Sequence, residues 1–279
     1  MDYWSVLRSL CRCEKRSSVV RRNDLLESEG SGWIAGDPGN CTTARLWSEW
    51  EIPTNLRHAR LIAVLAMCLS RGLLGQSAEQ IHLDAIENLE LGNLKADIVT
   101  YLGRACVRIE NTGAQDSGYG EGLAIVRGTS FRDGTIEVSL SGDTAPDAPP
   151  LLRGFVGIAF RVKDRSHFEL FYIRPKNGRS EDQLQRNHST QYMSIPGFPW
   201  DKLRSEACGK YESYVDLLPG QWTKLKIQVK GKIAKLYVAE AEEPTLIVND
   251  LKQPVSNGAI ALWVGQGTIA HFANLRITP

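Results

Sequence analysis

The sequence predicts an all-β domain, a two-sheet antiparallel jelly-roll sandwich, over residues 79–279. From Ile81 onward, short apolar runs are separated by Gly, Pro, Asn and Asp, which is the spacing typical of sandwiches and barrels. Within several runs apolar and polar residues alternate, so each strand has one buried and one wet face. No run after Ala96 has a sustained helical period. The fold class therefore follows from spacing and alternation together.

The composition is that of an ordinary globular protein. Hydrophobic residues make up 42% and charged residues 23% of the 279 residues, so the chain has enough apolar surface to bury a core. The 33 Lys and Arg nearly balance the 32 Asp and Glu, giving a net charge of +1. This balance lacks the strong positive field of nucleic-acid-binding proteins, so no nucleic-acid partner is expected.

Residues 56–78 have the pattern of a secretion signal. Arg57, His58 and Arg60 form a basic start, Leu61 to Leu69 are apolar, and small residues suited to cleavage follow from Gly75 to Ala78. The apolar run is about nine residues, against the ~20 that a membrane-spanning helix needs, so no stable membrane span is expected. A buried core helix of the same length is the alternative. The signal interpretation predicts a secreted or periplasmic protein.

Residues 1–55 show neither a 3.6-residue nor a 2.0-residue period, so no element there has a face to bury. We expect an unstructured or non-native leader, followed by the signal-like segment 56–78 and the sandwich 79–279. Translation that begins near Leu56 would explain why a signal is preceded by other residues. N-terminal sequencing of secreted material tests this, since a mature N-terminus upstream of residue 60 would exclude it.

The expected strands follow one another with short connections. Their ranges are Ala105–Glu110, Leu123–Arg127, Thr135–Leu140, Phe155–Val162, His167–Arg174, Lys224–Val229, Ala259–Val264 and Ile269–Ile277. The segment Gln80–Leu94 suits either one helical turn or a strand. Gly231 marks a tight hairpin, and the run from Gly265 to Thr268 has the composition of another hairpin turn.

The run Phe155–Val162 is apolar on both faces apart from Arg161, as expected of a central strand in a two-layer sandwich. Antiparallel pairing with His167–Ile173 follows from the polar turn between them. This run is therefore expected to lie in the middle of one sheet.

The six cysteines do not have the paired spacing of a zinc site. After removal of a signal, Cys106 and Cys208 would remain, and an oxidising compartment permits a disulfide between them. The sequence leaves this bridge open, because it does not give the distance between the two Cα atoms.

Three motifs resemble the concanavalin A-like lectin/glucanase superfamily, and within it the laminin G-like and 3-keto-disaccharide hydrolase-like jelly rolls. They are FRDGTIEV from Phe131, GQWTKLKIQV from Gly220 and FANLRI from Phe272. The resemblance covers Ala105 to Thr278 and implies a carbohydrate-directed role, with carbohydrate as the partner. We expect Gly134 to bend the chain into a strand, Trp222 to seal one end of the core, and Phe272 to face opposite Leu275.

The sequence departs from this family at two positions. The strand Ile136–Leu140 carries a single carboxylate, Glu137, whereas retaining glycosidases require two carboxyl groups about 5 Å apart. Ala273 stands where many relatives have an aspartate that helps to hold calcium. No cofactor is therefore expected, and a calcium ion is not supported.

The segment from Tyr172 to Trp200 is the candidate ligand site, because polar and aromatic residues crowd there without alternation. A long irregular connection in a compact domain is usually functional or disordered. Planar donors and aromatic rings suit sugar hydroxyls and pyranose faces. The predicted ligand-binding residues are Tyr172, Arg174, Arg186, Asn187, His188, Gln191, Tyr192 and Trp200. The alternative is a solvated surface loop, with Trp200 plugging its base.

Two residues of this region are candidates for proton transfer, Glu169 and His188. Glu169 lies in an apolar run, where it is either poised for catalysis or paired with Arg161. The first hypothesis is an exported carbohydrate-binding sandwich. The alternative is a hydrolase or lyase acting on glycosides such as 3-keto-disaccharides, so the sequence leaves open whether the protein is an enzyme.

Overall fold

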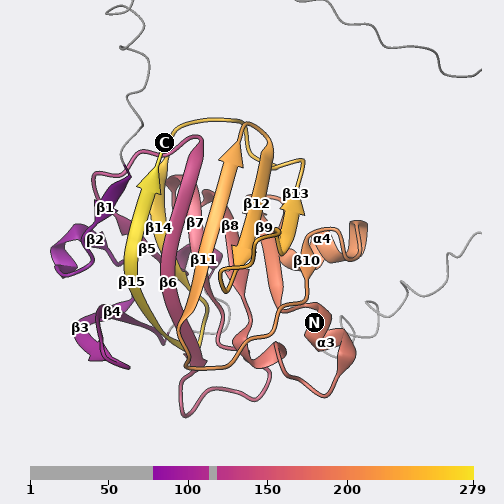
Figure 1. Ribbon diagram of the computed structural model, residues 1–279, viewed down its shortest axis with the longest axis horizontal. Coiled ribbons are helices and arrows are strands. Elements are labelled where there is room, and N and C mark those ends of the chain that lie inside the picture. The colour runs from indigo at the N-terminus through magenta and orange to yellow at the C-terminus, as the bar shows by residue number, and fades with distance from the viewer. Residues whose placement is uncertain (1–77, 113–117) are drawn as a thin grey trace, which may run out of the picture. The chain divides into compact units, whose positions relative to one another are not determined.

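The computed structural model describes residues 78–112 and 118–279, which form two stacked antiparallel β-sheets (Figure 1). The predicted two-sheet antiparallel jelly-roll sandwich is therefore confirmed. The predictions for residues 1–55 and for the signal-like segment fall outside the described residues, apart from Ala78 at the end of that segment.

The first sheet has eight strands, in the order β13-β12-β11-β6-β15-β4-β3, and β1 pairs with β15. Their bounds are β1 Glu79–Ile81, β3 Lys95–Tyr101, β4 Arg104–Asn111, β6 Gly134–Thr144, β11 Thr223–Lys230, β12 Ile233–Val238, β13 Leu246–Val248 and β15 Thr268–Thr278. The alternating runs of the sequence lie here. In β6 and β11 the Ile and Leu face is buried, while Lys224 and Gln228 on the other face are exposed.

The second sheet has seven strands, in the order β10-β9-β8-β7-β14-β5-β2. Their bounds are β2 Leu89–Glu90, β5 Leu123–Val126, β7 Val156–Asp164, β8 His167–Ile173, β9 Thr190–Ile195, β10 Glu212–Ser213 and β14 Ala259–Val264. The strand β7 lies between β8 and β14, as its two apolar faces predict.

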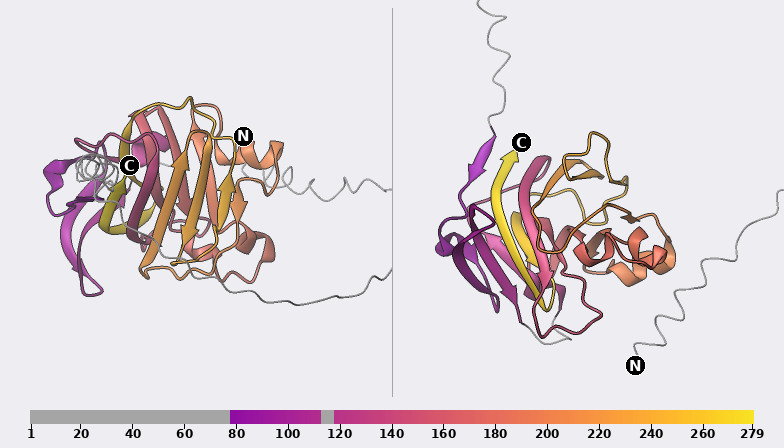
Figure 2. Two further views of the ribbon diagram at one scale, coloured as in Figure 1. Left: turned by 45° about the horizontal axis from the view of Figure 1, so that its top comes forward. Right: turned by 60° about the horizontal axis from the view of Figure 1, so that its bottom comes forward.

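The helices are short and lie in the connections between strands. They are the 3-10 turns η2 Ile86–Asn88, η3 Tyr119–Gly122 and η4 Pro175–Asn177, and the α-helices α3 Gln183–Asn187 and α4 Trp200–Glu206. Both α-helices lie beside β9 and β10, at one side of the sandwich (Figures 1 and 2). No helix in the described part of the chain is long and apolar enough to cross a membrane.

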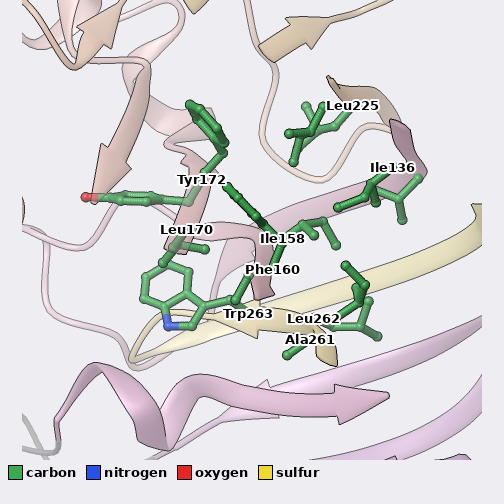
Figure 3. Close-up of a cluster of buried hydrophobic side chains, with 14 of the residues drawn as sticks. Ile136, Ile158, Phe160, Leu170, Tyr172, Leu225, Ala261, Leu262 and Trp263 are labelled. Atoms are coloured by element: carbon green, nitrogen blue, oxygen red, sulfur yellow. The ribbon is translucent and has the colours of Figure 1, made fainter. Parts of the chain in front are cut away.

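The core lies between the sheets, where fully buried aliphatic and aromatic side chains of both meet. Ile136 and Leu225 come from the first sheet, and Ile158, Phe160 and Leu262 come from the second (Figure 3). Burial of each such side chain stabilises the fold by about 1.5–3 kcal/mol.

A β-bulge interrupts β15, the last strand. The register against β6 shifts between Ala273 and Arg276, and Asn274 has a φ of 56°. Because of this bulge, Phe272 and Leu275 are both buried, although an even alternation would put them on opposite faces. Beside the C-terminal end of β15, Gly134 has a φ of 126° where β6 begins, which agrees with the expected bend.

Two local predictions were wrong. The segment Tyr172–Trp200 is not one irregular loop, because it contains η4, α3 and the buried strand β9. The run from Gly265 to Thr268 is not a hairpin turn, since it connects β14 in one sheet with β15 in the other. The sequence left open whether Cys106 and Cys208 are bonded, and the structure has no disulfide between them.

Candidate functional site

One row of side chains crosses the outer face of the seven-stranded sheet. The pairing registers place its members side by side on consecutive strands, in the order Leu123, Trp263, Gly157, Tyr172, Gln191 and Glu212. Paired residues of an antiparallel sheet share a face, so these side chains all point away from the core. The row therefore joins two aromatic rings to an amide and a carboxylate.

Gly157 lets the two aromatic rings of the row meet. The ring centroids of Tyr172 and Trp263 lie 5.1 Å apart with an interplanar angle of 51°. A Cβ atom at position 157 would lie 2.2 Å from the backbone oxygen of Phe171 and 2.6 Å from Cβ of Tyr172. Only glycine fits there without a shift of backbone.

We expect Gly157→Ala to lower the free energy of unfolding by about 2–3 kcal/mol, because the added methyl group overpacks against backbone that has no free space. Urea denaturation monitored by circular dichroism measures this change. Gly118→Ala is the matched control, since a Cβ at Gly118 would meet nothing within 4 Å. Equal stability of the two variants would contradict the role given to Gly157.

A cavity of about 400 Å³ opens over this row. Its aromatic lining consists of Tyr119, Phe155, Tyr172, Trp200 and Trp263, and its polar lining includes Asn111 and Gln266. The indole N–H of Trp263 donates to the backbone oxygen of Tyr119 at 2.9 Å, which fixes the ring against η3. A concave surface lined by aromatic rings with a few polar groups is the usual form of a small-ligand site.

Arg174 organises a buried polar network that contacts the cavity through Tyr172. Its guanidinium is buried and donates to Oη of Tyr172 at 2.7 Å, to Oε1 of Gln191 at 3.1 Å and to the backbone oxygen of His188 at 2.8 Å. Because Arg174 occupies a lone pair of the Tyr172 oxygen, the phenolic proton is left to donate elsewhere. Burial raises the pKa of Tyr172, so this hydroxyl stays protonated at neutral pH.

Glu212 is the carboxylate at the end of the row. Arg204 binds both of its oxygens, at 2.8 Å and 2.5 Å, while Arg174 and His188 lie 3.9 Å and 3.8 Å from it. The Arg204 guanidinium also lies over the Trp200 ring, 4.7 Å from its centroid. Arg204 therefore connects the buried polar network to the aromatic wall of the cavity.

His188 is held as a neutral imidazole beside this carboxylate. Its pKa is lowered to about 4, chiefly by burial and also by the neighbouring Arg204 and Arg174, whereas Glu212 and Asp182 oppose the shift. A histidine with this pKa is uncharged at pH 7 and is a weak base.

Of the predicted ligand-binding residues, Tyr172 and Trp200 line the cavity. Arg174, His188 and Gln191 belong to the buried network next to Tyr172 and do not line the cavity. Arg186 and Asn187 lie in α3 and do not line the cavity. Arg186 stacks on Tyr214 at 5.5 Å, and Oδ1 of Asn187 accepts a hydrogen bond from Gln183 at 2.8 Å.

Glu169 and Tyr192 lie on the opposite, core-facing side of the sheet, which separates them from this cavity. Glu169 accepts hydrogen bonds from the Tyr192 hydroxyl at 2.5 Å and from the backbone N–H of Gln253 at 2.8 Å. The expected partner Arg161 forms its ion pair with Asp133 at 3.0 Å, although its charge also acts on Glu169. Glu169 is fully buried, and that burial raises its pKa.

Sequence reasoning missed Trp263, Tyr119, Arg204 and Glu212. Trp263 stands in a run that is apolar throughout, so nothing marks the face on which it lies. Glu212 belongs to a two-residue strand that has no detectable period. Among residues 78–112 and 118–279, no three His, Cys, Asp or Glu side chains gather into a metal-binding group.

No protein-family model matches the sequence, and no curated protein matches it. Solved structures do match in three dimensions. A carbohydrate-binding module, CBM66, from Bacillus subtilis shares 14% identity with a TM-score of 0.39, over 68% of this chain and 98% of that one. The β-glucanase of Bacillus licheniformis shares 12% identity with a TM-score of 0.40, over 75% and 95%.

A third match is a protein of unknown function with a galectin-like fold from Bacillus subtilis. It shares 11% identity with a TM-score of 0.43, over 72% of this chain and 94% of that one. At these identities and TM-scores the likenesses say nothing about what this chain binds.

Proposed function

We propose that the protein binds a carbohydrate in the cavity over the Trp263–Tyr172 row. The observation that carries this proposal is an aromatic floor directly joined to a fixed polar network on the outer face of one sheet. Apolar ring faces stack on the C–H face of a sugar ring, while fixed donors orient its hydroxyl groups. Both requirements are met within one cavity.

A neutral sugar fits this site better than an acidic one. Arg174 donates hydrogen bonds to Tyr172, Gln191 and the His188 backbone, and Arg204 donates to Glu212. Both guanidinium groups are therefore already paired within the protein and are not available to an acidic ligand. What the cavity lining offers a ligand are the aromatic rings and the Gln266 side-chain amide.

Binding without hydrolysis is favoured over the glycosidase or lyase alternative. Among the described residues, the network contains one carboxylate, Glu212, and Arg204 engages both of its oxygens. Hydrolysis by the usual route needs two carboxyl groups flanking the bond. His188 and Glu212 do not line the cavity, so neither group contacts the space in which a glycosidic bond would lie.

Trp200→Ala is expected to weaken binding of a neutral oligosaccharide, identified on a glycan array, by about 10- to 100-fold, since a buried aromatic face contributes roughly 1.5–3 kcal/mol. Isothermal titration calorimetry measures this change. Tyr214→Ala removes an exposed aromatic ring next to Arg186, outside the cavity, and is expected to leave the affinity unchanged.

Two results would contradict the proposal. The first is an equal loss of affinity in Trp200→Ala and Tyr214→Ala, which would move the site to the α3 side. The second is release of shortened product from the bound glycan, abolished in His188→Gln, which would make the protein an enzyme.

We also propose that the protein is exported, with cleavage near Ala78. The support is the basic, apolar and small-residue order of residues 56–78 in the sequence. N-terminal sequencing of the secreted protein is the measurement that tests this.

A further inference from the structure

The outer face of the eight-stranded sheet carries a second cavity, of about 580 Å³. It lies on the opposite sheet from the first cavity and shares no lining residue with it. Its walls come from the tip of the β3–β4 hairpin, from the start of β11, and from the turn after β12. The volume is within the ~300–1,000 Å³ range of small-ligand sites.

The β3–β4 hairpin is pinned to this face. The Tyr101 ring stacks on the ring of His271, with centroids 3.7 Å apart and an interplanar angle of 4°. The Tyr101 hydroxyl donates to the backbone oxygen of Gly220 at 2.7 Å. These contacts fix the hairpin tip, and with it Arg104, at the edge of the cavity.

Trp222 lines this cavity. The sequence had suggested that it seals one end of the core, and that prediction was wrong. Trp222 shares the outer face of the sheet with Lys224, two residues along the chain. Its indole N–H donates to the Tyr101 backbone at 3.3 Å, and the Arg104 guanidinium lies over its ring, 5.3 Å from the centroid. The cation–π contact holds Arg104 by its face and leaves its N–H edges free.

Four polar side chains on this cavity have no hydrogen bond or ion pair within the described residues. They are Arg104 from the hairpin, Ser139 from β6, and Asn274 and Arg276 from the bulged part of β15. The bulge at Asn274 makes this possible, since it brings two polar residues to the cavity from a strand that otherwise alternates. Planar guanidinium groups without a partner are suited to bidentate pairing with a carboxylate.

The carboxylates of the cavity are already engaged. Lys224 lies 3.5 Å from Glu137 and 3.6 Å from Glu240, so one lysine is shared by both carboxylates. Arg104 and Arg276 have no ion pair within the described residues, and with them the charged side chains of the lining carry a net positive charge. A ligand that satisfies the lining must carry a negative group for the arginines and hydroxyl groups for Ser139 and Asn274.

We propose that this cavity is a second binding site, specific for a carboxylated saccharide such as a uronic acid residue. Arg104 and Arg276 bind the carboxylate, and Ser139 and Asn274 bind ring hydroxyls. The site is independent of the proposed neutral-sugar site, so either can fail without the other.

The probes are trigalacturonate, a hyaluronan hexasaccharide and fully methyl-esterified trigalacturonate, titrated calorimetrically into the full chain. We expect at least one carboxylated probe to bind and the neutral ester to bind at least tenfold more weakly. Arg104→Gln and Arg276→Gln should each reduce the affinity for the carboxylated probe about tenfold or more. The double variant should leave the binding of a neutral glycan in the first cavity unchanged.

Lys235→Gln is the matched control, because it removes one exposed charge from β12 of the same sheet, outside the cavity. Its affinity for the carboxylated probe should equal that of the natural chain. Failure of both carboxylated probes to bind, equal binding of acid and ester, or an equal loss in Lys235→Gln would each overturn the proposal.

Discussion

Replacing Glu212 with alanine is expected to lower the free energy of unfolding by about 3–5 kcal/mol, because removal of one partner leaves buried charge without compensation. Arg204 loses both of its charge-assisted hydrogen bonds, and the buried Arg174 loses its nearest carboxylate. Burial already lowers the pKa of Arg174, which means that its charge is costly where it lies. Chemical denaturation monitored by circular dichroism measures the loss.

The Glu212→Gln variant separates the effect of the side chain's size from the effect of its charge on stability. The amide keeps the size of the side chain and one acceptor for Arg204, so we expect a smaller loss of stability than in the alanine variant. Both variants should lower the pKa of His188 below about 4, since the Glu212 carboxylate is the group that raises it. A proton NMR titration reads this pKa directly. An unchanged His188 pKa in both variants would contradict the network described above.

The strands that the sequence identified best are those with one wet face. In β11, Lys224 and Gln228 alternate with buried Leu225 and Ile227, so the period is visible in the letters alone. The central strand β7 was found by a different signal, a short apolar run bounded by turn residues. In both cases the local pattern was sufficient to identify the strand, because each face of the strand keeps the same burial along most of its length.

The strand β9 could not be found in this way. Thr190 to Ser194 are all buried, polar and apolar alike, because this strand is covered on both faces. Its polar side chains are satisfied by partners distant in sequence, such as Arg174 for Gln191. Without those partners the segment has the composition of a loop, and this is why the region was predicted to be irregular.

The candidate site was predictable only in part, for a related reason. Period two places Tyr172 and Arg174 on one face of β8 and Glu169 on the other, which the structure bears out. Joining Tyr172 to Trp263 and Glu212, however, requires the register of five strands. Register depends on long-range pairing, which one sequence does not display.

The fold is also expected to lose stability as the pH falls from about 6.5 to 4, through His188 and His271. Burial lowers the pKa of each to about 4, with Arg108 adding to the effect at His271. In the unfolded chain both titrate near 6.5. Between these values the unfolded chain binds protons that the folded chain does not, so stability present above pH 6.5 is lost on acidification.

Each histidine accounts for on the order of 3 kcal/mol by this linkage. The loss should be measured by denaturation at several pH values between 6.5 and 4.5, above the range in which the low-pKa carboxylates such as Asp250 titrate. Over this range Glu169 acts in the opposite direction, because its raised pKa favours the folded state at low pH. The decisive comparison is therefore between variants at matched pH.

His188→Gln and His271→Gln should each flatten the pH dependence, and the double variant should remove most of the slope. His188 follows α3 and His271 lies in β15, and they have no hydrogen-bond or ion-pair partner in common among the described residues, so their contributions should add. If the double variant lost as much stability between pH 6.5 and 4.5 as the natural chain, other groups would be responsible. The conclusion that both imidazoles are neutral in the folded protein would then be wrong.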